Sequence, residues 1–176
     1  MKKNLLFLLL LFFYDVHSQG TCSTALPFCT GSNYMYPASI NTSPPSGTNF
    51  DCLLTQPNPA YYFLEIDNPG DLTIFMSSTP QNDIDFVCWG PFSNFNNICS
   101  QINTSQVVDC SYSPLWFETC DITGALAGEY YLLLITNYSN SNCNISFSQT
   151  GGNGSTNCCI LESAGIDTSF TICQND

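Results

Sequence analysis

Short runs rich in β-branched and aromatic residues alternate along the chain with clusters of Pro, Gly, Asn, Asp and Ser. No window repeats its apolar residues every three or four positions, as an amphipathic helix would. Leu72, Ile74 and Met76 instead recur at every second position, which places them on one face of a strand. The predicted strands span residues 32–40, 60–67, 72–77, 83–89, 106–112, 115–119, 129–136 and 144–149. About eight such strands predict an all-β fold, an antiparallel two-sheet β-sandwich of jelly-roll-like form.

Two stretches indicate how the strands are arranged. Residues 129–136 (EYYLLLIT) are apolar on both faces, so we expect this strand to lie at the centre of a sheet. The run 151–155 (GGNGS) has the composition of a flexible linker or of a domain edge. The sandwich is therefore predicted to occupy residues 19–157, and 158–176 to form a linker and the incomplete start of a following module.

The first 18 residues indicate the cellular compartment. Lys2 and Lys3 precede an apolar run of nine residues, and a small residue, Ser18, precedes the expected cleavage site. This is the pattern of a secretory signal peptide, residues 1–18, cut before Gln19. The apolar run is about half of the ~20 residues that cross a bilayer, which argues against a transmembrane anchor. We therefore expect a secreted protein that lies outside the cell or on its surface.

Removal of the signal peptide leaves a chain without any basic side chain. Both Lys residues and the one His lie before Gln19, whereas 13 of the 14 acidic residues follow Ser18. A surface without cations repels phosphate groups, so nucleic acid is excluded as a partner. Nucleophilic catalysis with an imidazole base, Schiff-base chemistry with Lys, and nearly all zinc enzymes are excluded as well. Only a pair of carboxylates could still act as acid and base, and we expect the protein not to be an enzyme.

All 11 cysteines lie in the exported part of the chain. In an oxidising compartment this number predicts a fold stapled by disulfides. No C-x-x-C pair is present, which argues against structural zinc. The odd count leaves one cysteine free or paired outside this segment, and Cys173 is the candidate.

Asp83 and Asp85 lie two positions apart on a predicted strand, so their side chains share a face. Two carboxylates about 7 Å apart repel unless a cation lies between them, and Ca²⁺ takes oxygen ligands. We therefore predict a calcium site at this pair, to which Asp109 and Asp121 could add ligands. The alternative is that both carboxylates are solvated at a strand edge, where charge discourages edge-to-edge pairing.

Four aromatic residues, Trp89, Phe92, Phe95 and Trp116, could stack on sugar rings. Trp89 and Phe92 lie at the end of a predicted strand and form the best candidate platform for binding such a ligand. The alternative, and the commoner role of large aromatic residues, is packing in the core and between the sheets.

Four short motifs follow one another in the middle of the chain: Asp83–Val87 (DIDFV), Asp109–Tyr112 (DCSY), Glu118–Cys120 (ETC) and Gly128–Tyr131 (GEYY). In this order they resemble the bacterial pre-peptidase C-terminal domain, a small β-sandwich appended to secreted proteases and surface proteins. The second motif is one residue shorter than the D-C-x-x-Y segment of that family. The resemblance implies a disulfide between Cys110 and Cys120, with Cys99–Cys110 as the alternative pairing.

A narrower resemblance is carried by Pro27–Gly31 (PFCTG), Asp83–Phe92 (DIDFVCWGPF), Leu134–Asn140 (LITNYSN) and Gln149–Gly152 (QTGG). These segments are similar to N-terminal modules of large surface proteins of gliding, type IX-secreting bacteria. In such proteins residues 164–167 and 172–173 would begin an immunoglobulin-like repeat. The resemblance thus implies that 158–176 contains the incomplete start of an immunoglobulin-like module.

Two functions from different classes remain open. The first is a non-catalytic structural or adhesion module of a secreted bacterial surface protein, stabilised by Ca²⁺. Its partners would be neighbouring modules of the same protein or a cell-surface protein. The second is a carbohydrate-binding module that contacts extracellular polysaccharide and serves a polysaccharide-degrading partner. No cofactor other than Ca²⁺ is expected.

Overall fold

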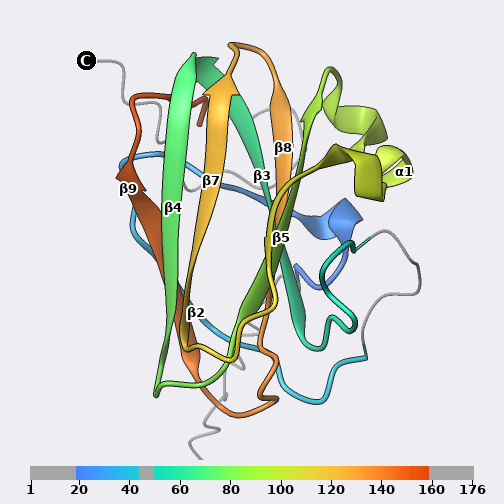
Figure 1. The fold of residues 1–176 in the computed structure, drawn as a ribbon, viewed down its shortest axis with the longest axis vertical. Coiled ribbons are helices and arrows are strands. Elements are labelled where there is room, and N and C mark those ends of the chain that lie inside the picture. The colour runs from blue at the N-terminus through green and yellow to red at the C-terminus, as the bar shows by residue number, and fades with distance from the viewer. Residues whose placement is uncertain (1–18, 44–49, 159–176) are drawn as a thin grey trace, which may run out of the picture.

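Residues 19–43 and 50–158 are described by the structure, a computed structural model; the predicted signal peptide and residues 159–176 lie outside them. The described chain forms two stacked sheets (Figure 1). The larger sheet has six strands, in the order β1-β3-β8-β5-β6, and β10 also pairs with β3. The smaller sheet has four strands, in the order β2-β9-β4-β7. Every pairing is antiparallel except that of β1 with β3.

Strands dominate the described fold, and its helical segments are short. The strands are β1 Leu26–Pro27, β2 Tyr34–Pro37, β3 Pro59–Asn68, β4 Gly70–Thr79, β5 Asp85–Phe92, β6 Val107–Ser111, β7 Phe117–Ala125, β8 Tyr130–Thr136, β9 Asn144–Gly151 and β10 Ser155–Thr156. The helical segments are α1 Ile98–Gln101 and three 3-10 turns, η1 Cys22–Thr24, η2 Phe95–Asn97 and η3 Thr104–Gln106. In these two ranges of the chain no helix is long and apolar enough to cross a bilayer. The predicted all-β sandwich is confirmed.

The eight predicted strands correspond to β2 through β9. β8 lies between β3 and β5 in the larger sheet, so its predicted central place is confirmed. β7 continues beyond the predicted end at residue 119, because Cys120, Ile122 and Ala125 keep buried positions along it. β1 and β10 have two residues each, which is too short to show a period in the sequence.

The larger sheet is buried on both of its faces. Ile74 of β4 and Leu133 of β8 belong to the first core, which fills the space between the sheets. Trp89 belongs to a second core on the outer face of the larger sheet. Two covering segments, residues 50–53 and 95–102, lie over this second core and supply part of its side chains. A strand buried on both faces carries apolar residues at successive positions, which accounts for the sequence of β8.

Three disulfides tie the covering segments and the ends of the described chain to the sandwich. The pairs are Cys22–Cys99, Cys52–Cys110 and Cys29–Cys158, with Cα–Cα distances of 5.7, 6.1 and 5.5 Å. Their sequence separations are 77, 58 and 129 residues. Bonds that close long loops restrict the unfolded chain most, so these three stabilise the fold even where a covering segment has little core of its own.

The expected disulfide between Cys110 and Cys120 is wrong, and the alternative pairing of Cys110 with Cys99 is wrong too, because Cys110 is bonded to Cys52. The physical reason is the alternation of side chains along a strand. Cys110 lies opposite Val87 and points with it into the second core. Cys120 instead belongs to the first core, between the sheets. The two sulfurs therefore lie on opposite faces of the larger sheet.

Residues 151–155 form a fixed turn and not a flexible linker, which was one of the two alternatives that their composition left open. They turn the chain sharply from β9 into β10, and the Gly154 N–H donates a hydrogen bond to the Asp71 carbonyl at 2.9 Å. Gly152 has a φ of +86°, and a Cβ at this position would overlap the same carbonyl oxygen. The glycines are required by this close approach, and the sandwich continues to Cys158.

Gly152→Ala is expected to destabilise the domain more than Gly128→Ala. Gly128 also has a positive φ, +83°, but nothing lies within 4 Å of a Cβ placed there. Alanine at Gly128 should therefore lower the free energy of unfolding only by the penalty for a left-handed backbone, about 1–2 kcal/mol. At Gly152 the overlap with Asp71 adds to that cost. Chemical denaturation of both variants measures the difference, and equal losses would contradict the tight packing of residues 151–155.

Candidate functional site

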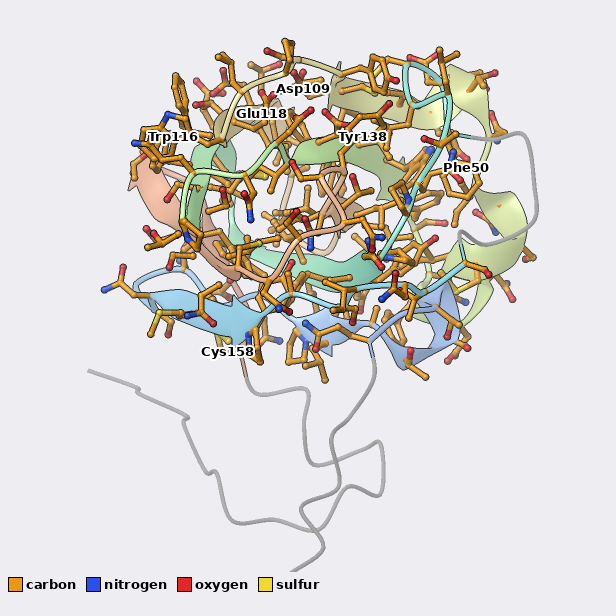
Figure 2. All side chains as sticks on the ribbon, turned by 90° about the horizontal axis from the view of Figure 1, so that it is seen from below. Phe50, Asp109, Trp116, Glu118, Tyr138 and Cys158 are labelled. Carbon is orange, nitrogen blue, oxygen red and sulfur yellow. A yellow bond between two sulfur atoms is a disulfide. The ribbon has the colours of Figure 1, made fainter. Side chains whose placement is uncertain are left out.

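Acidic side chains gather at the end of the sandwich where β5 begins. Asp83 precedes β5, Asp85 is its first residue, and Glu118 lies near the start of β7. Each of these carboxylates is close enough to another to influence its ionisation, and we name the three the acidic cluster. Figure 2 looks onto this end of the molecule and labels Glu118 together with Trp116 and Asp109.

Hydrogen bonds to two neighbouring loops fix the backbone just before β5. The Asp83 N–H donates to the Ser139 hydroxyl at 2.8 Å, and the Ser139 N–H donates to the Asp83 carbonyl at 3.2 Å. The Ile84 N–H donates to the Leu115 carbonyl at 3.1 Å. The start of β5 is thus held between the β8–β9 loop and the β6–β7 connection.

Several buried side-chain oxygens around the start of β5 lack a hydrogen-bond partner. They are Asp83 Oδ1, Asp85 Oδ2, Glu118 Oε1, Thr136 Oγ1 and Asn137 Oδ1. Asp85 is only 1% exposed, and it lies opposite Thr136 in the pairing of β5 with β8. A buried oxygen without a partner costs roughly 1–3 kcal/mol, and such groups are rare in folded proteins. Their concentration here leaves this end of the sandwich with several polar atoms for which the described residues supply no partner.

The acidic cluster holds its protons more tightly than free carboxyl groups do. Burial is the main cause that raises the pKa of Asp85 from 3.8 to about 7, and the charges of Asp83 and Glu118 contribute to the rise. A hydrogen bond from the Ser113 backbone acts in the opposite direction and lowers this pKa. Burial also raises the pKa of Glu118, although a hydrogen bond with Ser111 opposes it. Burial raises the pKa of Asp83 as well. Because no Lys, Arg or His follows Ser18, no basic side chain of the chain after this point can form an ion pair with the cluster.

The donor atoms around the cluster are oxygens, which are the ligands that Ca²⁺ prefers. Carboxylate, amide and hydroxyl oxygens are all represented among the unpaired atoms. Across residues 19–43 and 50–158, no three or more Asp, Glu, His or Cys side chains are gathered closely enough to hold an ion as they stand. The cluster therefore fits Ca²⁺ in its chemistry, and binding would require the carboxylates to close around the ion.

Asp109 and Asp121, the further ligands expected from the sequence, have other partners. Asp109 accepts hydrogen bonds from the backbone N–H groups of Cys110 at 2.8 Å and of Asp121 at 2.7 Å. The Asp121 carboxylate accepts from the Thr73 hydroxyl at 2.7 Å. Glu118 joins the cluster instead. The alternation of buried and exposed positions along β7 is the signal that identifies its carboxylate as buried.

Two exposed tyrosines border the acidic cluster. The Tyr112 hydroxyl donates to the Tyr138 hydroxyl at 3.0 Å, and the two rings meet edge to face with centroids 5.5 Å apart. This hydrogen bond, together with the nearby charges of Asp85 and Asp83, raises the pKa of Tyr112 to about 12. The Tyr112 phenol therefore stays neutral at physiological pH and adds no negative charge to the site.

Trp89 and Phe92 cannot form the sugar-binding platform expected of them. Both are buried in the second core, beneath the covering segments. Phe95 is 40% exposed, but its ring packs against Phe63 with centroids 4.5 Å apart. The sequence left packing in the core as the alternative role of these rings, and this alternative is correct for Trp89 and Phe92.

Aromatic rings are exposed elsewhere, on the outer face of the smaller sheet. Phe75 of β4 and Phe117 of β7 are each 36% exposed, and their rings stack with centroids 6.2 Å apart. Trp116 contacts Phe117 edge to face at 5.1 Å. We name these three residues the aromatic patch. It lies at the same end of β7 as Glu118.

Comparison with known proteins adds little to this description. No protein-family model matches the chain, and no curated protein is similar to it. Among solved structures, the pre-peptidase C-terminal domain of a collagenase from Bacillus anthracis is similar in fold. It shares 8% sequence identity with a TM-score of 0.43, and the match covers 72% of this chain and 94% of that chain. Similarity at this level does not assign the chain to a family.

In the absence of divalent cations, the free energy of unfolding is expected to fall as the pH rises from about 4 to about 7. Folded Asp85 keeps its proton up to about pH 7, whereas its ordinary pKa is 3.8, so its stabilising contribution is complete below pH 4 and is lost through pH 7. One pKa unit corresponds to ~1.4 kcal/mol.

Urea denaturation at several pH values, with chelator present, measures this dependence. Asp85→Asn should flatten the curve and should be more stable than the native sequence at pH 8. Asp67→Asn, which neutralises an exposed carboxylate of β3, serves as the matched control and should leave the slope nearly unchanged. A slope that Asp85→Asn does not alter would contradict the burial of an unpaired carboxylate at this position.

Proposed function

We propose that residues 19–158 form a non-catalytic, calcium-stabilised module of a secreted bacterial surface protein, with a structural or adhesive role. The observation that carries this proposal is the group of buried, unpaired oxygens at the acidic cluster, in a chain that has no basic side chain after Ser18. A divalent ion would supply the missing partner and would offset the repulsion among Asp83, Asp85 and Glu118. Ca²⁺ suits such a site because its coordination is flexible and uses oxygen ligands alone.

Secretion is supported by two independent features. The first 18 residues have the pattern of a signal peptide. The three disulfides of the described chain require an oxidising compartment, which is found outside the cytosol. Both features favour a site of action outside the cell or on its surface.

The chemistry of the described residues supports a non-catalytic role. Cys88, Cys120 and Cys143 lie outside the three disulfides, but all three are buried and cannot meet a substrate. A glycosidase places its two carboxylates on either side of a bound sugar, with room for that sugar between them. Asp85 is instead almost wholly buried, which suits a structural ion better than a substrate.

The finer assignment, to large surface proteins of gliding, type IX-secreting bacteria, rests on sequence resemblance alone. Asp83–Phe92 and Leu134–Asn140 carry most of that resemblance. Under this assignment the module would act as a spacer or adhesive unit, and its partners would be neighbouring modules of the same protein or a protein of the cell surface.

The mature domain is expected to melt at a higher temperature in millimolar Ca²⁺ than in chelator at equal ionic strength. A ligand at a hundredfold excess over its Kd stabilises the folded state by about 2.7 kcal/mol. For a domain of this size, 1 kcal/mol corresponds to roughly 2–4 °C. Asp85→Asn and Glu118→Gln should each shrink the shift, whereas Asp67→Asn should preserve it. Scanning calorimetry provides the measurement.

Equal melting temperatures with calcium and with chelator would refute the calcium site. Matched ionic strength is essential, because simple screening of 13 acidic groups would otherwise imitate binding. A calcium shift that survives in both Asp85→Asn and Glu118→Gln would place the ion somewhere other than the acidic cluster, and would equally contradict the proposal.

A carbohydrate-binding role is the second candidate, and the aromatic patch supports it. Phe75, Phe117 and Trp116 expose ring surface on one sheet face, where a polysaccharide chain could stack. Under this alternative, insoluble polysaccharide would retain the native domain but not Trp116→Ala or Phe75→Ala. Leu126→Ala removes an equally apolar residue, 60% exposed, from a loop outside the patch, and should be retained. Equal retention of all four proteins would eliminate this candidate.

A further inference from the structure

Two thiols from different sheets meet in the first core. Cys88 lies on β5 of the larger sheet, and Cys120 lies on β7 of the smaller sheet. Both are 0% exposed, and both belong to the cluster of side chains between the sheets. Neither takes part in the three disulfides described above.

A short chain of contacts holds the two cysteines close together. Cys88 lies opposite Asp109 in the pairing of β5 with β6, so the two side chains share the face that meets the smaller sheet. The Asp109 carboxylate crosses to that sheet and accepts a hydrogen bond from the Asp121 N–H at 2.7 Å. Asp121 directly follows Cys120. The Cys88 side chain lies close enough to Cys120 to influence the ionisation of its thiol.

The surroundings of Cys120 favour the neutral, protonated form of its thiol. Hydrogen bonding to Cys88, burial, and the charges of Asp109 and Asp121 raise the pKa of Cys120 well above its ordinary value. A metal held by thiolates would need further ligands, and the described residues contain no group of three or more Asp, Glu, His or Cys side chains able to hold one. A disulfide carries no charge and needs no ligand, so it suits this position better than a thiolate or a metal.

We propose that Cys88 and Cys120 form an additional disulfide in the exported protein and so join the two sheets covalently across the first core. In this reaction each thiol loses its proton, and the pair loses two electrons to a disulfide-bearing oxidant, whose own S–S bond is cleaved to two thiols. One cysteine first attacks the oxidant to give a mixed disulfide, and the other then displaces the remaining thiol. Because both sulfurs are inaccessible in the folded domain, the exchange takes place before the sheets close.

The bond would change how the module responds to force and to reductants. Without it, each described disulfide joins a loop, a turn or a covering segment to the rest, and no covalent link crosses the first core. With it, β5 and β7 cannot slide apart while the chain is pulled from its ends. Burial would also shield the bond, so reductants should cleave it only after the domain unfolds.

Mapping of the cysteines in the exported protein tests the proposal. The mature protein is collected from an oxidising compartment, alkylated with iodoacetamide in denaturant without reduction, and digested. Chymotrypsin is suitable because no Lys or Arg follows the signal peptide. The expected product is a cross-linked pair of peptides, one containing Cys88 and the other Cys120. Recovery of both cysteines in alkylated form, or of either bonded to a different cysteine, would overturn the proposal.

Two variants provide a second and independent reading. Cys88→Ala should leave Cys120 as a newly alkylated thiol, whereas Cys143→Ala, which removes another buried thiol, should leave the Cys88–Cys120 cross-link intact. A Cys120 that is alkylated to the same extent in the native protein and in Cys88→Ala would refute the bond. If Cys88→Ala is not exported, mapping of the native protein still decides the question.

Discussion

The chain after Ser18 has no cationic side chain and must find other partners for its carboxylates, and this constraint shapes the domain. Several of these partners are backbone N–H groups of the described residues. Asp71 accepts from the Gly124 N–H at 2.7 Å, and Glu129 accepts from the Leu126 N–H at 2.8 Å. Asp109 accepts from two such groups, one of them on the other sheet. Hydrogen bonds from backbone N–H groups to carboxylates thus connect loops and sheets, a role that ion pairs can have in other proteins.

The acidic cluster is the exception to this pattern. There, burial raises the pKa values of Asp83, Asp85 and Glu118, and oxygens remain unpaired. The cost must be offset elsewhere in the fold. The larger sheet is buried on both faces, so its central strands make apolar contacts on two sides, and disulfides hold the covering segments over the second core. Such a scaffold can tolerate a strained acidic end that a cation would relax.

The alternation of residues predicted the strands well because it is a local property. β8 could be placed at the centre of its sheet from its own residues. The partners of each face could not be predicted, because they depend on which segment covers which sheet. The prediction of a Cys110–Cys120 disulfide was wrong for this reason. The prediction of an exposed platform at Trp89 and Phe92 was wrong for the same reason, because the pattern of a strand does not predict which segment covers it.

The candidate site was predictable in part for the same reason. Asp83 and Asp85 stand out because they are neighbours in sequence. Glu118 comes from another sheet, and only the three-dimensional arrangement brings it to them. Thr136 joins through strand register, because it is opposite Asp85. A single sequence does not predict long-range pairing of this kind. The alternation of residues along a strand does predict which of them are buried.

The central claim is that Asp85 is a buried carboxylate whose missing partner is a cation. The most direct measurement is its pKa in the mature domain, obtained from the side-chain carboxyl ¹³C shift across a pH titration with chelator and again with Ca²⁺. The account predicts a pKa of about 7 in chelator, far above the ordinary 3.8, and a clear fall when Ca²⁺ is added. A pKa near 3.8 under both conditions would contradict it.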